Sequence, residues 1–117
     1  LFRSEPTLFA EVDNGATIAQ EEIFGPVLSV ISYADDADAV RIANDSQFGL
    51  GGSVWSDDAE RAIGVARRVK SGTVGVNGYM PSLGSPFGGV KASGMGREFG
   101  PEAIGAYQQL KSIYVMG

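Results

Sequence analysis

The fold is decided by residues 27–77, which read VLSVISYADDADAVRIANDSQFGLGGSVWSDDAERAIGVARRVKSGTVGVN. The opening residues of this segment, 27–33, form a nearly continuous apolar and β-branched run, which is typical of a strand buried on both faces. Residues 36–44 space their apolar side chains as an amphipathic helix of about two to three turns does. Either Asp35 or Asp36 can provide the N-cap of that helix.

A second strand and helix follow on the same plan. Residues 48–52 are glycine-rich and end the first helix, and residues 53–55 resume an extended pattern. Asp57 stands three residues before Glu60, which predicts a capping box at the start of the next helix. Residues 73–77 are then expected to form another short strand, and the apolar face of the intervening helix consists of Ala59, Ala62, Ile63, Ala66 and Val69. The order predicts an α/β fold whose βαβαβ connections build one parallel sheet.

The flanking segments are less regular. Residues 1–9 can hold a short extended piece, residues 13–15 carry an Asp-Asn-Gly turn signal, and residues 17–22 fit more than one structure. Residues 79–100 contain six glycines and almost no periodicity. A glycine-rich loop of that length inside a folded chain is usually functional or closely packed.

The C-terminal residues predict a helix and a strand. Pro101 suits the first turn of a helix, whose apolar stripe would be Ala103, Ile104, Tyr107 and Leu110. Residues 113–115 predict a last short strand, for which the preceding elements offer no obvious partner. We expect that strand to pair with another segment or another subunit.

Composition excludes several classes of function. The 117 residues contain no cysteine and no histidine, which excludes disulfides, thiolate metal sites and Ser-His-Asp or Cys-His catalysis. The net charge of −5 argues against nucleic acid as a partner, and no apolar run is long enough to cross a membrane. We therefore expect no metal, no nucleic acid and no membrane as partners, and a cytoplasmic setting fits. The first residue is Leu1, which suggests a piece of a longer protein.

No self-contained catalytic set is visible in the residues. Glu21 and Glu22 are neighbours, and in an extended segment their carboxylates point to opposite sides, which makes a poor acid–base pair. Lys91 and Ser93 leave a Ser-Lys dyad open, although nothing around them singles out a nucleophile. The glycines of residues 88–97 match neither the Walker pattern nor a full dinucleotide fingerprint.

The chain resembles the aldehyde dehydrogenase superfamily. Four stretches carry the resemblance in the family's order: residues 21–27 (EEIFGPV), 44–50 (NDSQFGL, closely followed by Val54-Trp55), 72–77 (GTVGVN) and 86–98 (PFGGVKASGMGRE). The resemblance covers nearly the whole chain. It implies that this is the C-terminal part of such an enzyme.

The resemblance also implies the division of the chain. Residues 1–104 would be the C-terminal part of the catalytic α/β domain, and residues 105–117 would be the end of a helix and an oligomerisation arm that adds a strand at a subunit interface. The cofactor domain and the catalytic cysteine region would lie upstream, outside this chain. The partners implied are the upstream part of the same enzyme and further copies, in a homodimer or homotetramer.

The activity implied is oxidation of an aldehyde to a carboxylic acid with NAD or NADP. In the family, a cysteine thiolate attacks the aldehyde and a glutamate activates water, and both residues lie upstream of the segment seen here. This chain alone should therefore be inactive. Two alternatives are a non-catalytic binding or assembly module that keeps the fold, and a relative of the glutamate- or aldehyde-phosphate-type reductases.

Three positions match the family's cofactor-binding residues. By resemblance, Glu22 would bind the nicotinamide ribose hydroxyls, Phe24 would pack beside the nicotinamide ring, and Leu50 would line the cavity of cofactor and substrate. The plain alternatives are an exposed acidic residue for Glu22 and ordinary core residues for Phe24 and Leu50.

Other positions match the family's substrate tunnel. By resemblance, Phe87 stands at its mouth, while Asn77 and residues 79–85, with Met80 and Leu83, approach the same cavity. The apolar side chains of this loop suggest an apolar, non-anionic aldehyde. Glu98 matches a glutamate proposed to relay protons, with a salt bridge to a nearby cation as the alternative.

Overall fold

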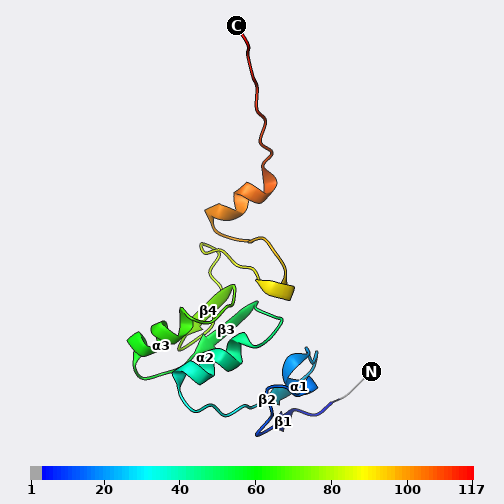
Figure 1. Cartoon of the computed structure of the whole chain (residues 1–117), viewed down its shortest axis with the longest axis vertical. Helices are drawn as coiled ribbons and strands as arrows, with labels where there is room; N and C mark the ends of the chain where they lie inside the picture. The colour runs from blue at the N-terminus through cyan, green and yellow to red at the C-terminus, as the bar shows by residue number, and fades with distance from the viewer. Residues whose placement is uncertain (1–3) are drawn as a thin grey trace.

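The computed structural model describes residues 4–117. Along the chain (Figure 1) the elements are β1 (Thr7–Phe9), α1 (Thr17–Gln20), β2 (Val27–Ser29), α2 (Asp36–Asn44), β3 (Gly51–Val54), α3 (Ala59–Ala66), β4 (Thr73–Val76) and the 3-10 helices η1 (Lys91–Ser93) and η2 (Pro101–Tyr107). All five central elements expected from the sequence are present, and so is the short extended piece near the N-terminus, as β1.

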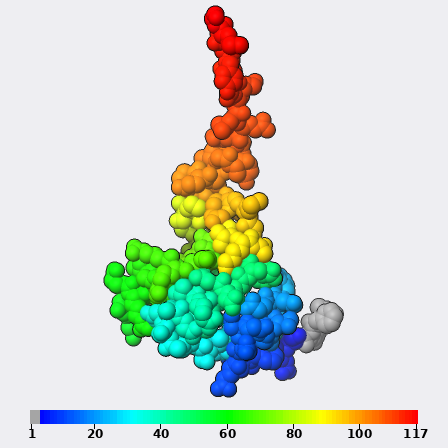
Figure 2. Space-filling view, viewed as in Figure 1, coloured from blue at the N-terminus to red at the C-terminus, as the bar shows by residue number. Residues whose placement is uncertain are grey.

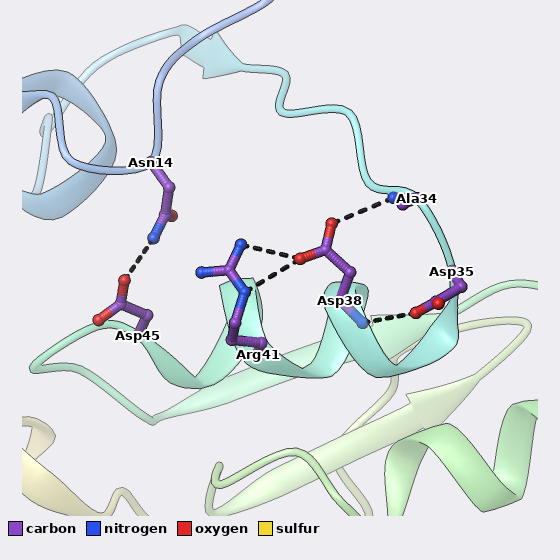
Figure 3. Close-up of polar contacts among 6 residues, drawn as sticks. All are labelled: Asn14, Ala34, Asp35, Asp38, Arg41 and Asp45. Carbon is purple, nitrogen blue, oxygen red and sulfur yellow. Dashed lines mark hydrogen bonds and ion pairs between the residues drawn. The ribbon is translucent and has the colours of Figure 1, made fainter.

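Helix α2 begins as its sequence predicts. Asp35 is the N-cap, and its Oδ1 accepts the Asp38 N–H at 2.9 Å (Figure 3). The Asp38 carboxylate in turn accepts from the Ala34 N–H at 3.1 Å and from the Arg41 guanidinium at 2.8 Å. This group satisfies backbone donors at the start of a helix, where no intrahelical acceptor exists.

The capping box predicted for α3 is wrong by one residue. Asp58, not Asp57, is the N-cap, and its side chain accepts the Arg61 N–H at 3.0 Å. Asp58 has the extended backbone that an N-cap needs, with φ −94° and ψ 101°. Glu60 therefore falls one position too early to close a capping box.

The strands form two separate parallel pairs. β1 pairs with β2, and β3 pairs with β4 through four residue partners from Gly51↔Thr73 to Val54↔Val76. The single βαβαβ sheet predicted from the sequence is therefore wrong for residues 4–117, since β2 pairs with β1 and leaves β3 to β4. Sequence patterns show that a segment is a strand, and its partner is decided by tertiary packing.

The C-terminal segment leaves the body of the molecule (Figures 1 and 2). The helix expected from Pro101 is a 3-10 helix that ends at Tyr107, so Leu110 lies outside it. Its apolar side chains are uncovered, with Ile104 57% and Tyr107 86% exposed, so no packing holds it as a longer α-helix. Residues 108–117 form no strand within the described chain, and the predicted terminal strand stays a prediction.

Little of the described chain is buried. Ala62 is its one fully buried apolar side chain, and Leu28, predicted to be buried, is 58% exposed. The accessible surface is 9377 Å², against about 6,100 Å² for a compact protein of this mass. The radius of gyration is 18.9 Å, where about 13 Å is usual for this length. The helices of residues 4–117 also include none that is long and apolar enough for a membrane span.

Candidate functional site

A cavity of about 890 Å³ lies between α1 and the β3–β4 pair. Two of the residues expected to bind a cofactor line it: Glu22, which follows α1, and Leu50, which precedes β3. Its size falls within the range of small-molecule sites. The structure therefore brings these two residues to one site.

Glu22 is presented by the end of α1. The helix stops at Gln20, and Glu21 is its C-cap, with an extended backbone and an N–H that donates to Thr17 O at 2.9 Å. The following Glu22 is exposed at the cavity, and among residues 4–117 no group hydrogen-bonds or pairs with its carboxylate. An acceptor left open in this way can receive hydroxyl donors from a ligand.

Phe24 lies apart from Glu22. Its ring is 99% exposed and does not line the cavity. The backbone around it turns sharply, because the Gly25 N–H donates to Ile23 O and the Val27 N–H donates to Gly25 O, at 2.9 and 2.8 Å. These turns present the ring outward, immediately before β2.

Leu50 is held by a closely packed turn. Gly49, beside it, is buried; its carbonyl accepts from the Gly72 and Val90 N–H groups at 3.0 and 2.9 Å. The Gly49 N–H donates to Ser93 Oγ at 3.0 Å. The three later stretches that carry the family resemblance thus meet at one residue, and Leu50 next to it is 46% exposed toward the cavity.

A smaller cavity of about 210 Å³ lies beside β4 and is lined by Met80 and Phe87. Both were expected in the substrate tunnel. Phe87 is held in place by a backbone pair with Glu98, with both N–H···O distances at 2.7 Å. Its ring also faces that of Phe99, at a centroid distance of 6.1 Å. The lining of this cavity carries no charged side chain.

The remaining expected tunnel residues lie elsewhere. Asn77 lines neither cavity. Its side-chain amide hydrogen-bonds the backbone of Ser56, accepting from the Ser56 N–H at 2.8 Å and donating to Ser56 O at 2.9 Å. Leu83 is 77% exposed and also lines neither cavity. Glu98 has an exposed side chain, and among residues 4–117 its carboxylate has no salt-bridge partner.

The Ser-Lys dyad left open by the sequence is not assembled. Lys91 Nζ donates to Asn44 O and Ser46 O, at 3.0 and 2.9 Å, and so satisfies carbonyls at the end of α2. Ser93 Oγ accepts from Gly49. Both side chains thus hold the turn before β3. Among residues 4–117, no three His, Cys, Asp or Glu side chains gather as metal ligands.

The paired charges at the large cavity belong to Asp36 and Arg61. The guanidinium lies 2.6 Å from the carboxylate and joins the start of α2 to α3. The hydrogen bond from Arg61 holds the pKa of Asp36 below its ordinary value, and the carboxylate raises the pKa of Arg61. For Asp38, the Ala34 backbone N–H and then Arg41 lower the pKa. Asp36 and Arg61 are therefore paired with each other and join α2 to α3.

Sequence reasoning missed three polar residues near the cavity, namely Asn14, Gln20 and Asp45. Gln20 Nε2 donates to Asn14 O at 2.6 Å and to Asp45 O at 2.9 Å, and Asn14 Nδ2 donates to Asp45 Oδ2 at 2.7 Å. The sequence indicates only that Asn14 lies in a turn, Gln20 at the end of a helix and Asp45 at a helix C-cap. Polar residues are common in turns and at helix ends because their side chains bond the nearby backbone. The long-range hydrogen bonds of these three residues could therefore not be predicted from the sequence.

Comparison with known proteins gives one consistent family. The sequence model of the "Aldehyde dehydrogenase family" matches residues 2–113. The chain is 65% identical over 113 residues to a geranial dehydrogenase of Castellaniella defragrans, covering 97% of this chain and 24% of that protein. It is 47% identical over 115 residues to a betaine aldehyde dehydrogenase of Brucella melitensis, with the same coverage of 97% and 24%.

Solved structures agree with the sequence comparison. A Mycobacterium tuberculosis aldehyde dehydrogenase complexed with NAD+ matches with a TM-score of 0.87 and 51% identity, covering 95% of this chain and 24% of that one. A Pseudomonas syringae aldehyde dehydrogenase C variant, complexed with NAD+ and octanal, matches with a TM-score of 0.83 and 48% identity, covering 87% and 21%. The chain thus spans about a quarter of the length of the curated relatives it matches.

Proposed function

This chain belongs to the aldehyde dehydrogenase family, and we propose that it is the C-terminal part of an enzyme that oxidises an aldehyde to a carboxylic acid with NAD or NADP. The single observation that carries the proposal is the 890 Å³ cavity that both Glu22 and Leu50 line. The whole enzyme is proposed to be a cytoplasmic homodimer or homotetramer. Within it, residues 1–104 complete the catalytic domain and residues 105–117 form the oligomerisation arm.

Glu22 and Leu50 in the cavity, together with Phe24 outside its lining, fit a nicotinamide cofactor. The open carboxylate of Glu22 can accept hydrogen bonds from two neighbouring ribose hydroxyls, and the exposed ring of Phe24 can pack beside the nicotinamide. Leu50 supplies an apolar wall. The bound cofactor would supply the hydride acceptor. The solved relatives that hold NAD+ support this assignment.

The substrate proposed is an apolar, non-anionic aldehyde. The smaller cavity is lined by the apolar side chains of Met80 and Phe87 and by hydroxyl-bearing residues, without a charged side chain, and Leu83 on the same loop is apolar and exposed. A geranial dehydrogenase among the relatives and octanal in a solved relative are in keeping with such a substrate. Asn77 is proposed to hold the start of this loop near the tunnel.

The bond-making groups are proposed to come from outside these residues. No cysteine occurs in the 117 residues, so a thiolate nucleophile has to come from the rest of a longer chain, and the glutamate that activates water is proposed to come from there as well. Glu98 is proposed to relay protons toward that glutamate. Its exposed carboxylate, which has no salt-bridge partner among residues 4–117, and its backbone pairing with Phe87 support the role.

A second candidate is a non-catalytic assembly module that keeps the fold. The uncovered apolar side chains of residues 104–116 favour it, since they suit a partner surface. The two hypotheses predict different lengths for the encoding reading frame. A frame that extends upstream by several hundred residues and encodes a cysteine supports the enzyme, whereas a frame that begins near Leu1 supports the module.

The cofactor contact is tested by Glu22→Gln in the whole enzyme. We expect the dissociation constant of NAD+ to rise about tenfold, because a neutral amide replaces a charged acceptor of two hydroxyl donors. Calorimetric titration measures the change. Glu60→Gln makes the same chemical change at a residue of α3 that lines neither cavity, and it should leave binding as it is. Equal affinities for Glu22→Gln and the unchanged enzyme would refute the ribose contact.

A further inference from the structure

Few polar contacts join the two parts of the described chain. The N-terminal unit, residues 4–33, contains β1, α1 and β2, and the remainder contains the β3–β4 pair with its helices. No strand ladder joins the two within residues 4–117. Every hydrogen bond that passes from residues 4–33 to residues 35–117 ends on one residue, Asp45.

The contact at Asp45 uses both its side chain and its backbone. Asn14 Nδ2 donates to Asp45 Oδ2 at 2.7 Å (Figure 3). Gln20 Nε2 donates to Asp45 O at 2.9 Å and to Asn14 O at 2.6 Å, which closes a triangle of three residues. We call this triangle the Asn14–Gln20–Asp45 clamp. Asp45 is the C-cap of α2, so the clamp fastens α1 to a rigid helix end.

The clamp lies next to the residues proposed to bind the cofactor. Gln20 is two residues before Glu22, and Asp45 is five residues before Leu50. Gln20, Glu22 and Leu50 all line the same cavity. The separation of Glu22 from Leu50 therefore depends on how the N-terminal unit sits on α2. The clamp provides the hydrogen bonds between that unit and α2.

We propose that the Asn14–Gln20–Asp45 clamp is a positioning device that sets Glu22 at the distance from Leu50 at which the cofactor is bound. The proposal rests on the proposed ribose contact of Glu22. Asn14 and Asp45 do not line the cavity, and the clamp is proposed to act through Glu22. A misplaced carboxylate would lose its hydroxyl partners even though every cofactor-contacting residue is present.

The test, made in the whole enzyme, exchanges the side-chain donor Asn14 and the side-chain acceptor Asp45. Asn14→Asp sets two carboxylates against each other in place of a 2.7 Å hydrogen bond. We expect the dissociation constant of NAD+ to rise about fivefold to tenfold, as for loss of a hydrogen bond to a charged group. Asp45→Asn alone keeps an oxygen acceptor and should change affinity by less than about twofold.

The double variant Asn14→Asp, Asp45→Asn is the decisive arm. It restores one carboxylate and one amide with their roles reversed, and the net charge of the pair is that of the original chain. We expect NAD+ affinity to return to within about twofold of the unchanged enzyme. Asn14→Ala, which removes the bond without adding charge, provides a second weakened variant if Asn14→Asp does not yield folded enzyme.

The outcomes separate this proposal from the proposed function. Weaker binding in the single variant and recovery in the double variant support the clamp. Unchanged binding in Asn14→Asp or Asn14→Ala, with weakened binding in Glu22→Gln, overturns the clamp alone. Persistent weakness in the double variant also overturns it. Unchanged binding in Glu22→Gln overturns the ribose contact, and the positioning role with it.

Discussion

At the scale of single residues, glycine and acidic positions do most to shape the site. Gly49 fixes the turn before β3, because its carbonyl and its N–H have hydrogen-bond partners in two distant stretches of the chain. Glu22 has the opposite character, since it is exposed and open to a ligand. A side chain at Gly49 would clash with its neighbours, whereas Glu22 is proposed to act through its carboxylate.

Gly49→Ala should destabilise the whole enzyme by about 1–3 kcal/mol, the usual cost of overpacking a filled site. An added Cβ would lie 2.7 Å from both Lys70 O and Val90 Cγ2. Denaturant unfolding measures the change. Gly52→Ala is the matched control, because its Cβ would meet no atom within 4 Å. Equal unfolding free energies for the two variants would show that the turn is not closely packed.

At the scale of elements, helix ends decide the local structure. The N-cap side chains of α2 and α3 each accept the backbone N–H three residues on, at 2.9 and 3.0 Å. Lys91 closes the far end of α2 by donating to Asn44 O and Ser46 O. These helices are short, so their ends account for a large share of their backbone hydrogen bonds.

The corrected cap of α3 can be checked directly. Asp58→Ala should cost the whole enzyme about 1 kcal/mol of unfolding free energy, because the Arg61 N–H loses its acceptor. Asp57→Ala removes a neighbouring carboxylate that caps nothing and should lie within about 0.5 kcal/mol of the unchanged enzyme. Thermal and denaturant unfolding compare the two. A larger loss at Asp57 would restore the capping box expected from the sequence.

The sequence predicts the features that neighbouring residues determine, such as the ends of a helix. The bounds of α2 follow from its apolar spacing and from Asp35, and they appear as expected. The pairing of β2 with β1 could not be predicted, because the apolar pattern of a strand does not name its neighbour. The meeting of Glu22 with Leu50 in one cavity was implied by family resemblance alone. The bonds of Gln20 to Asp45 had no sequence signal beyond two helix ends.

At the scale of the whole molecule, the described chain exposes more surface than a protein of its mass does. The excess over the compact value is about 3,300 Å², the difference between 9377 Å² and about 6,100 Å². Large apolar side chains such as Tyr107, Leu110 and Tyr114 are 86%, 102% and 88% exposed. Figure 2 shows the C-terminal residues standing clear of the body. An area of this size is comparable to that of a protein–protein interface.

Aldehyde-dependent formation of NADH, measured for the whole protein and for the isolated 117 residues at equal concentration, tests the central claim most directly. We predict turnover by the whole protein with an apolar aldehyde such as octanal and none by the isolated chain, because the chain has the open Glu22 carboxylate but no cysteine nucleophile. Turnover by the isolated chain, or a whole protein inactive toward every aldehyde with either NAD or NADP, would contradict the account.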